Sequence, residues 1–104
     1  MADEEIITGV LVEESWTTLE QAAAVCCVEV EWLVQHVESG LLPGADQTGG
    51  TWRLSTTAVR HAQRMRRIER DFDAVPELAA LVADLQEELD RLRTRLAIVE
   101  QRTV

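Results

Sequence analysis

The sequence predicts a mostly α-helical fold, in which a small domain with short β-strands is followed by a leucine-rich coiled-coil helix. Residues 30–41 place apolar side chains at offsets of 3, 4, 7 and 11, which is the spacing of a helical stripe. Residues 51–54 are short and strand-like, and residues 78–99 space apolar side chains alternately by four and three. The expected parts are an acidic N-terminal segment with a short strand over 1–14, a compact domain over 15–75 and a dimerising helix over 76–104.

The first expected elements are a strand and a short helix. Residues 6–12 are apolar and rich in β-branched side chains, which predicts a strand. A helix then begins near Thr17 or Thr18, because Thr17 with Glu20, or Thr18 with Gln21, has the spacing of a capping box. The apolar face of this helix consists of Leu19, Ala22, Ala23 and Cys26.

A second helix, a hairpin and a third helix complete the expected domain. Gly40 ends the second helix, since glycine is the usual residue just beyond a helix C-terminus. The segment 41–54 is predicted to form a small hairpin, or wing. Ser55 or Thr56 can cap a third helix that reaches about Phe72. The apolar stripe of this third helix is Ala58, Val59, Ala62, Met65, Ile68 and Phe72.

The C-terminal helix carries a heptad pattern. Pro76 suits its first turn. The charges beside the seam favour a parallel pair, because Glu88 would face Arg93 of a second chain and Arg95 would face Glu100. An antiparallel pair, or a helix folded back on its own chain, fits the same pattern. The predicted dimerisation seam is Leu78, Val82, Leu85, Leu89, Leu92, Leu96 and Val99.

Electric charge is divided unevenly along the chain of 104 residues. The sequence has 19 acidic and 10 basic residues, which gives a net charge of −9. Every basic residue is an arginine beyond position 50, so residues 1–50 carry ten acids and no base. Nucleic acids and anionic membranes bind cations, so this acidic half should repel both and attract a basic protein surface.

The sequence predicts a cytoplasmic location. No apolar run approaches the roughly 18 residues of a membrane span. Residues 1–5 lack the basic start of a secretory signal. Two cysteines form neither a disulfide framework nor a four-cysteine metal site.

No motif predicts catalysis, a metal or a cofactor. Cys26 and Cys27 are adjacent, so on a helix they point about 100° apart, unlike the cysteines of redox and metal motifs. Burial as small apolar residues is the favoured interpretation. His36 and His61 have no ligand partners at i+3 or i+4. We therefore expect a protein that is not an enzyme.

The remaining charged runs and tryptophans have structural interpretations. The acids Glu87 and Glu88 are expected to be solvated, and the arginines of residues 60–70 to form a solvated helix face, with phosphate contact as the alternative. Trp32 either packs at the rim of the core, which is favoured, or anchors a partner, and Trp52 packs on the helices. The expected ion pairs within the third helix are Arg67 with Asp71, Arg66 with Glu69 and Arg70 with Asp73.

The order of these elements resembles the MerR-like regulators, which have a helix-turn-helix, a wing, a third helix and a leucine-rich dimer helix. The similarity covers about residues 17–85, with Val28 at the buried turn position and Cys27 where the family has glycine. DNA-binding members carry arginine and an aromatic residue on the second helix, whereas residues 33–36 here are Leu-Val-Gln-His. The resemblance therefore implies the scaffold and argues against DNA binding. The passages that carry it are Leu33, Glu38-Ser39-Gly40-Leu41-Leu42-Pro43 and Trp52-Arg53-Leu54-Ser55.

A closer resemblance is to the CbpM-type chaperone modulators, which are small, acidic and MerR-like in fold. It spans about residues 17–97. Members of that family bind the J-domain of a DnaJ-like, CbpA-type co-chaperone and block its stimulation of the Hsp70 ATPase. The passages that carry the resemblance are Thr51-Trp52-Arg53-Leu54, Met65-Arg66-Arg67-Ile68-Glu69, Val75-Pro76-Glu77-Leu78 and the run from Leu85 to Leu96.

The resemblance implies partner control, and the charge pattern agrees with it because J-domains present a basic helix. We expect a homodimer that captures a J-domain, with no direct contact to nucleic acid or membrane. A MerR-like transcriptional regulator of stress genes and a structural dimer module are the alternatives. The expected partner-binding residues are Glu29, Glu31, Trp32, Gln35, His36 and Glu38 on one exposed face, and Arg66, Arg67 and Arg70 on a second surface.

Overall fold

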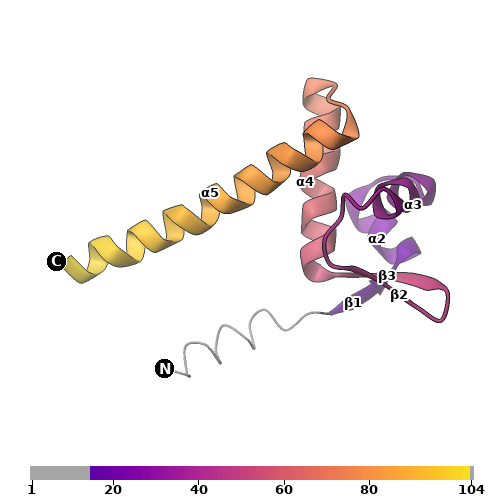
Figure 1. Ribbon diagram of the computed structural model, residues 1–104, viewed down its shortest axis with the longest axis horizontal. Helices are drawn as coiled ribbons and strands as arrows, with labels where there is room; N and C mark the ends of the chain where they lie inside the picture. The colour runs from indigo at the N-terminus through magenta and orange to yellow at the C-terminus, as the bar shows by residue number, and fades with distance from the viewer. Residues whose placement is uncertain (1–14, 104) are drawn as a thin grey trace.

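The computed structural model describes residues 15–103 and is mostly helical, with a small sheet (Figure 1). The strand predicted over residues 6–12 lies outside the described residues. The elements in chain order are β1 (Trp16–Thr18), α2 (Leu19–Cys26), α3 (Val30–Glu38), β2 (Ala45–Thr48), β3 (Thr51–Ser55), α4 (Thr56–Phe72) and α5 (Pro76–Thr103).

The three strands form an antiparallel sheet in the order β1-β3-β2. Strands β2 and β3 are the predicted wing, with Gln47 opposite Trp52. Strand β1 is not among the predicted elements. Thr17 of β1 lies opposite Leu54 in the sheet, and its hydroxyl donates to the Leu54 carbonyl oxygen over 3.1 Å. Thr17 therefore belongs to the sheet, which leaves Thr18 as the helix cap.

Hydrogen bonds cap both ends of helix α2, through side chains at its start and through the backbone at its end. The sequence predicts part of this arrangement. The Thr18 hydroxyl accepts from the Gln21 amide, and the Gln21 side chain accepts from the Thr18 amide, which confirms the second of the two capping boxes considered. At the other end Cys27 has φ 59° and ψ 46°, in the left-handed region, and its N–H bonds back to Ala24. The tight turn between α2 and α3 therefore uses a cysteine where glycine is easier to accommodate.

The core lies between α2, α3, β3 and the near face of α4. Leu33 and Val37 of α3 and Met65 of α4 are buried, as the helical stripes predict, and Leu54 of β3 is buried with them. Phe72 is a correction, because α4 ends there and its side chain is 76% exposed. The buried position that the apolar stripe of α4 omitted is His61.

The wing leads into α4 through a close contact between a glycine and a helix cap. The Ser55 hydroxyl accepts from the Ala58 amide and caps α4. Gly44 has φ +95°, and a Cβ atom on it would lie 2.5 Å from the Ser55 hydroxyl oxygen. Glycine is therefore required at position 44 both for the backbone conformation and for the space beside the cap.

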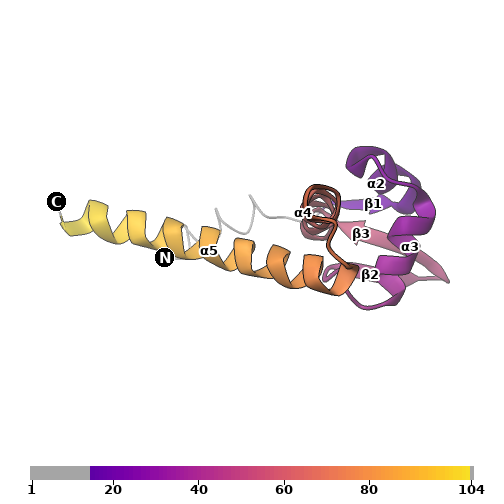
Figure 2. The ribbon, with the colours of Figure 1, turned by 90° about the horizontal axis from the view of Figure 1, so that it is seen from above.

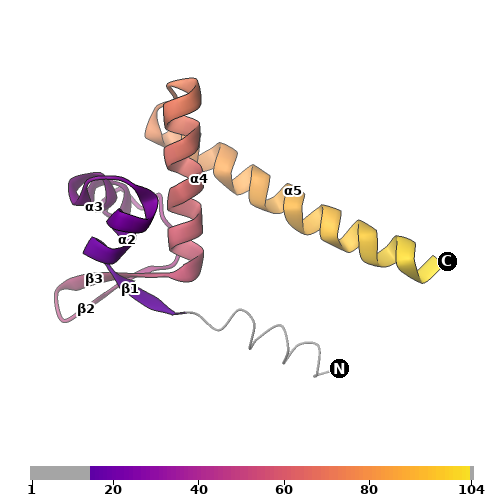
Figure 3. The same ribbon diagram turned by 180° about the vertical axis from the view of Figure 1, so that it is seen from behind.

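Helix α5 packs on α4 through small side chains and then leaves the domain. Ala79, Ala80 and Ala83 are the residues of α5 that are buried. Beyond them the helix projects to one side of α4, while the sheet, α2 and α3 lie on the other side (Figures 2 and 3). None of the described helices combines the length and apolarity needed to cross a bilayer.

The predicted dimerisation seam is mostly uncovered in the single chain. Val82 is half-buried against the core, whereas the other six seam residues are 44–59% exposed. The helix therefore does not fold back to cover the seam, which removes one of the three alternatives that the heptad pattern left open. The exposed members are Leu78, Leu85, Leu89, Leu92, Leu96 and Val99.

Replacing Cys27 with glycine should stabilise the domain. The left-handed conformation disfavours any residue with a Cβ atom, so Cys27→Gly is expected to raise the free energy of unfolding by about 0.5–1 kcal/mol. Urea unfolding monitored by tryptophan fluorescence measures the change. Cys27→Ala is the matched control, because it removes the thiol and keeps the Cβ atom. Equal stability of the glycine and alanine variants would contradict the strain argument.

Candidate functional site

Helix α3 is the second helix of the helix-turn-helix, and it presents acidic side chains to solvent. Glu29, Glu31, Gln35 and Glu38 are exposed, and we call these four residues the acidic face. Glu29 is the N-cap residue of α3 and Glu31 lies in its first turn, where carboxylates interact favourably with the helix dipole. The two acids therefore stabilise the helix while making its exposed surface anionic.

The arginine of the wing is engaged by neighbours on the sheet. The Arg53 guanidinium lies 3.5 Å from the Asp46 carboxylate. It also lies 4.5 Å from the centre of the Trp16 ring, within the range of a cation–π contact. Its charge is thus partly balanced before any partner arrives, and the helix-turn-helix and wing offer a phosphate little net attraction.

His36 is a correction to the expected exposed face, because its side chain is buried. Its Nδ1 lies 2.7 Å from the Trp32 carbonyl oxygen and its Nε2 lies 2.8 Å from the Glu69 carboxylate. Both partners are oxygen acceptors, so the ring bridges a carbonyl of its own helix and a carboxylate on α4. His36 therefore joins α3 to α4 and is not available on the surface.

Trp32 is held by the same network. Its Nε1–H donates to Glu69 over 3.0 Å, and its ring stacks on the His36 ring with centroids 3.7 Å apart. The side chain is half-buried against the core, which confirms the favoured position at the rim. The sequence signal for this cluster was the i,i+4 spacing of Trp32 and His36, while its partner Glu69 lies 33 residues beyond His36 and could not be assigned from spacing.

An open groove of about 390 Å³ runs between the turn after α2, the start of α3 and the far end of α4. It brings together residues from the two predicted partner-binding surfaces. Arg67 is exposed but does not line it. The lining residues are Cys27, Val28, Glu29, Trp32, Arg66, Glu69 and Arg70.

The ion pairs of α4 differ from the expected ones. Glu69 pairs with His36, whereas a pair with Arg66 was expected. Arg70 pairs with its neighbour Asp71, 3.1 Å away, whereas a pair with Asp73 was expected. Arg64 reaches across to α5, where its guanidinium lies 2.6 Å from Asp90. Glu69 thus has a partner on another helix in place of its predicted neighbour on α4, whereas Arg70 pairs with the adjacent residue.

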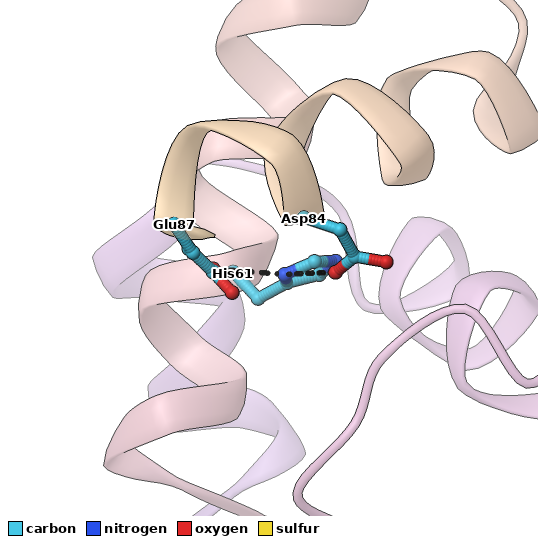
Figure 4. Close-up of side chains that lie close together, drawn as sticks. All are labelled: His61, Asp84 and Glu87. Carbon is cyan, nitrogen blue, oxygen red and sulfur yellow. Dashed lines mark hydrogen bonds and ion pairs between the residues drawn. The ribbon is translucent and has the colours of Figure 1, made fainter. Parts of the chain in front are cut away.

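His61 is fully buried and its ring faces two carboxylates on α5 (Figure 4). Its Nδ1 lies 3.0 Å from Glu87 and 3.7 Å from Asp84. Glu87 is a further correction, since it is half-buried and hydrogen-bonded to His61, whereas solvated charge was expected. These three side chains are the one group within residues 15–103 whose donor atoms lie close enough to hold a metal ion.

The two cysteines have different environments. Cys26 is buried, and burial, assisted by the neighbouring Cys27 thiol, raises its pKa. Its thiol lies 3.8 Å from the Val59 carbonyl oxygen, to which it donates. Cys27 is exposed at the turn, which corrects the expectation that both cysteines are buried. A raised pKa lowers the thiolate fraction, so Cys26 acts as a core residue, in agreement with the sequence interpretation.

Removing the Glu69 carboxylate should destabilise the domain. Glu69→Ala leaves the Trp32 and His36 donors without their acceptor, so the free energy of unfolding is expected to fall by about 2–3 kcal/mol. Urea unfolding measures the loss. Glu31→Gln on the same domain removes an exposed carboxylate and should change stability by no more than about 0.5 kcal/mol. A Glu69→Ala variant as stable as Glu31→Gln would show that the network contributes nothing.

Comparison with families of known proteins matches residues 15–101 to the family described as MerR HTH family regulatory protein. Comparison with curated proteins and with solved structures gives no match. The matched region contains the helix-turn-helix, the wing, α4 and nearly all of α5. The chain therefore belongs to the MerR family of helix-turn-helix regulatory proteins.

Proposed function

We propose that this protein is a non-enzymatic chaperone modulator that binds the J-domain of a DnaJ-like, CbpA-type co-chaperone and blocks its stimulation of Hsp70. The observation that carries the proposal is the anionic character of α3, whose exposed face holds Glu29, Glu31 and Glu38. A recognition helix that reads DNA needs donors for base edges and cations for phosphates. The exposed acids of α3 instead suit a basic helix on the surface of a protein.

The groove beside α3 supplies the apolar component that a protein partner needs. Trp32 and Val28 contribute apolar surface, and Glu29 lies at the same edge. Charges at the rim of an interface steer association, whereas buried aromatic anchors supply much of the affinity. A basic helix laid along α3 would meet the acidic face and insert an apolar side chain beside Trp32.

A homodimer completes the proposed adaptor. Six apolar seam residues of α5 are exposed in the single chain, and a second copy of the helix would bury them. Two copies would present two acidic faces, so a dimer would engage two J-domains or one J-domain protein that is itself dimeric. We place this protein in the cytoplasm, where a J-domain co-chaperone would meet it.

Transcriptional regulation is the second candidate, and the family match is the observation that favours it. Arg60, Arg64, Arg66, Arg67 and Arg70 give α4 the cations that α3 lacks. Arg64 and Arg70 are paired with carboxylates, which reduces what they offer to phosphate. A gel shift with the DNA upstream of the gene separates the two functions, because a tight, sequence-specific shift would favour the regulator.

Neutralising the acidic face should weaken J-domain binding. The variant Glu29→Gln with Glu31→Gln is expected to raise the Kd for a J-domain of the same organism by about fivefold to tenfold, mainly by slowing association. The variant Glu88→Gln with Asp90→Asn removes the same charge from α5 and should leave the Kd within about twofold.

Calorimetry at low and high salt measures these values, and the wild-type complex should weaken as salt rises. The stimulated Hsp70 ATPase should fall as the complex forms. Failure to bind any J-domain at low salt, or equal effects of the two variants, would count against the proposal.

Charge placed in the seam should separate the dimer. Leu89→Asp puts a carboxylate into an apolar interface, so light scattering should report monomers at concentrations where the wild type is dimeric. Ile98→Asp is the matched control, because Ile98 is an exposed apolar residue of the same helix outside the seam. A monomeric wild type, or dissociation by both variants, would contradict the assignment of the interface.

A further inference from the structure

The contact between α4 and α5 contains a cluster of side chains that J-domain binding and dimerisation do not use. His61 projects from α4, and Asp84 and Glu87 project from α5 toward its ring (Figure 4). Residues three apart on a helix lie on the same face, so α5 directs both carboxylates to one point. The imidazole is fully buried, whereas the Asp84 side chain is 61% exposed.

The distances in the cluster are close to those of a metal site. The His61 Nδ1 lies 3.0 Å from the Glu87 oxygen and 3.7 Å from the Asp84 oxygen, and all three donor atoms lie within 4.8 Å of one another. Donor atoms that each lie ~2.0–2.1 Å from a tetrahedral zinc ion are about 3.3 Å apart. The two measured distances from Nδ1 bracket this spacing, so a small movement of the exposed Asp84 side chain completes a three-donor set.

We infer that His61, Asp84 and Glu87 form a binding site for a divalent cation of the zinc class, which fastens α5 to α4. One imidazole nitrogen and two carboxylate oxygens suit Zn²⁺ better than Mg²⁺, which prefers oxygen donors and retains its water. The ion would displace the proton on Nδ1, and water on the exposed Asp84 side would fill the fourth position. The site lies in the domain core contact and is independent of the proposed partner.

Three arginines, Arg60, Arg64 and Arg91, line the surface cavity that Glu87 shares. Two of them have carboxylates of their own, since Arg64 pairs with Asp90 and Arg91 pairs with Glu88. The Nε2 of His61 is buried without a hydrogen-bond partner in the structure of residues 15–103. Because it lacks a partner already, moving the ring proton to Nε2 when the metal binds Nδ1 breaks no further hydrogen bond there.

A metal at this point would control the direction of the C-terminal helix. The buried contact of α5 with α4 is made by Ala79, Ala80 and Ala83, whose side chains are small. Glu87 lies one turn beyond Ala83 in the sequence of α5. Beyond its contact with α4, the helix α5 leaves the domain (Figure 1). An ion bridging His61 and Glu87 would extend the fixed part of α5 by one turn beyond Ala83, past the exposed seam residue Leu85.

Zinc titration of the untagged full chain tests this site. The Cys27→Ser variant serves as the parent protein, because it removes the exposed thiol as a competing ligand. Calorimetry with ZnCl₂ should show one ion per chain, and the thermal unfolding midpoint should rise with zinc. MgCl₂ at the same concentration should produce neither effect. No saturable zinc binding, or an equal response to magnesium, would overturn the inference.

Carboxylate variants locate the ion. Asp84→Asn and Glu87→Gln in the same background should each raise the Kd for zinc by about tenfold or more, since each removes a ligand charge. Glu88→Gln removes the neighbouring carboxylate, which bonds Arg91, and should keep the parent affinity. Asp84 is exposed, so its variant keeps the fold even where Glu87→Gln is destabilised. Unchanged affinity in the Asp84→Asn and Glu87→Gln variants would exclude this site.

Discussion

Two buried contacts between a histidine and a carboxylate determine how the helices of this protein fit together. Helix α4 lies at the centre of both, because it offers Glu69 to His36 of α3 and receives Glu87 of α5 at His61. A buried polar group left without its partner loses its solvation and gains nothing in return. Each contact therefore restricts its helix to one position on α4, which apolar packing alone would specify less strictly.

The surface of the helix-turn-helix follows from the first contact. Because Glu69 bonds both His36 and Trp32, it turns these two side chains inward and leaves the acids of α3 outside. The groove beside Trp32 lies between the start of α3 and the far end of α4. The exposed side of α3 thus presents carboxylates. All arginines of the chain lie in β3, α4 and α5.

The part of α5 that projects from the domain, here called the arm, is held in place by the contact at His61 and by small side chains. Alanines allow α5 to approach α4 closely, but they bury little apolar area compared with leucine or isoleucine. Most of the larger apolar residues of α5 remain exposed, and Val82 is the one packed against the core among the seam residues. Stability of the arm is therefore divided between a modest contact with its own domain and whatever covers the seam, which is why the polar contact at His61 matters for its direction.

The sequence by itself determined the local features of this fold, because they depend on neighbours in the chain. Helical stripes, the proline at the start of α5 and the separation of charge could be read from it, and the capping-box spacing narrowed the cap of α2 to Thr17 or Thr18. The tertiary structure alone decided that His36 meets Glu69, 33 residues away, and that His61 meets Glu87, 26 residues away. It also decided the pairing of Thr17 with the wing. Such contacts join residues whose spacing follows no helical or strand period, so only the packing of α4 against its neighbours could bring them together.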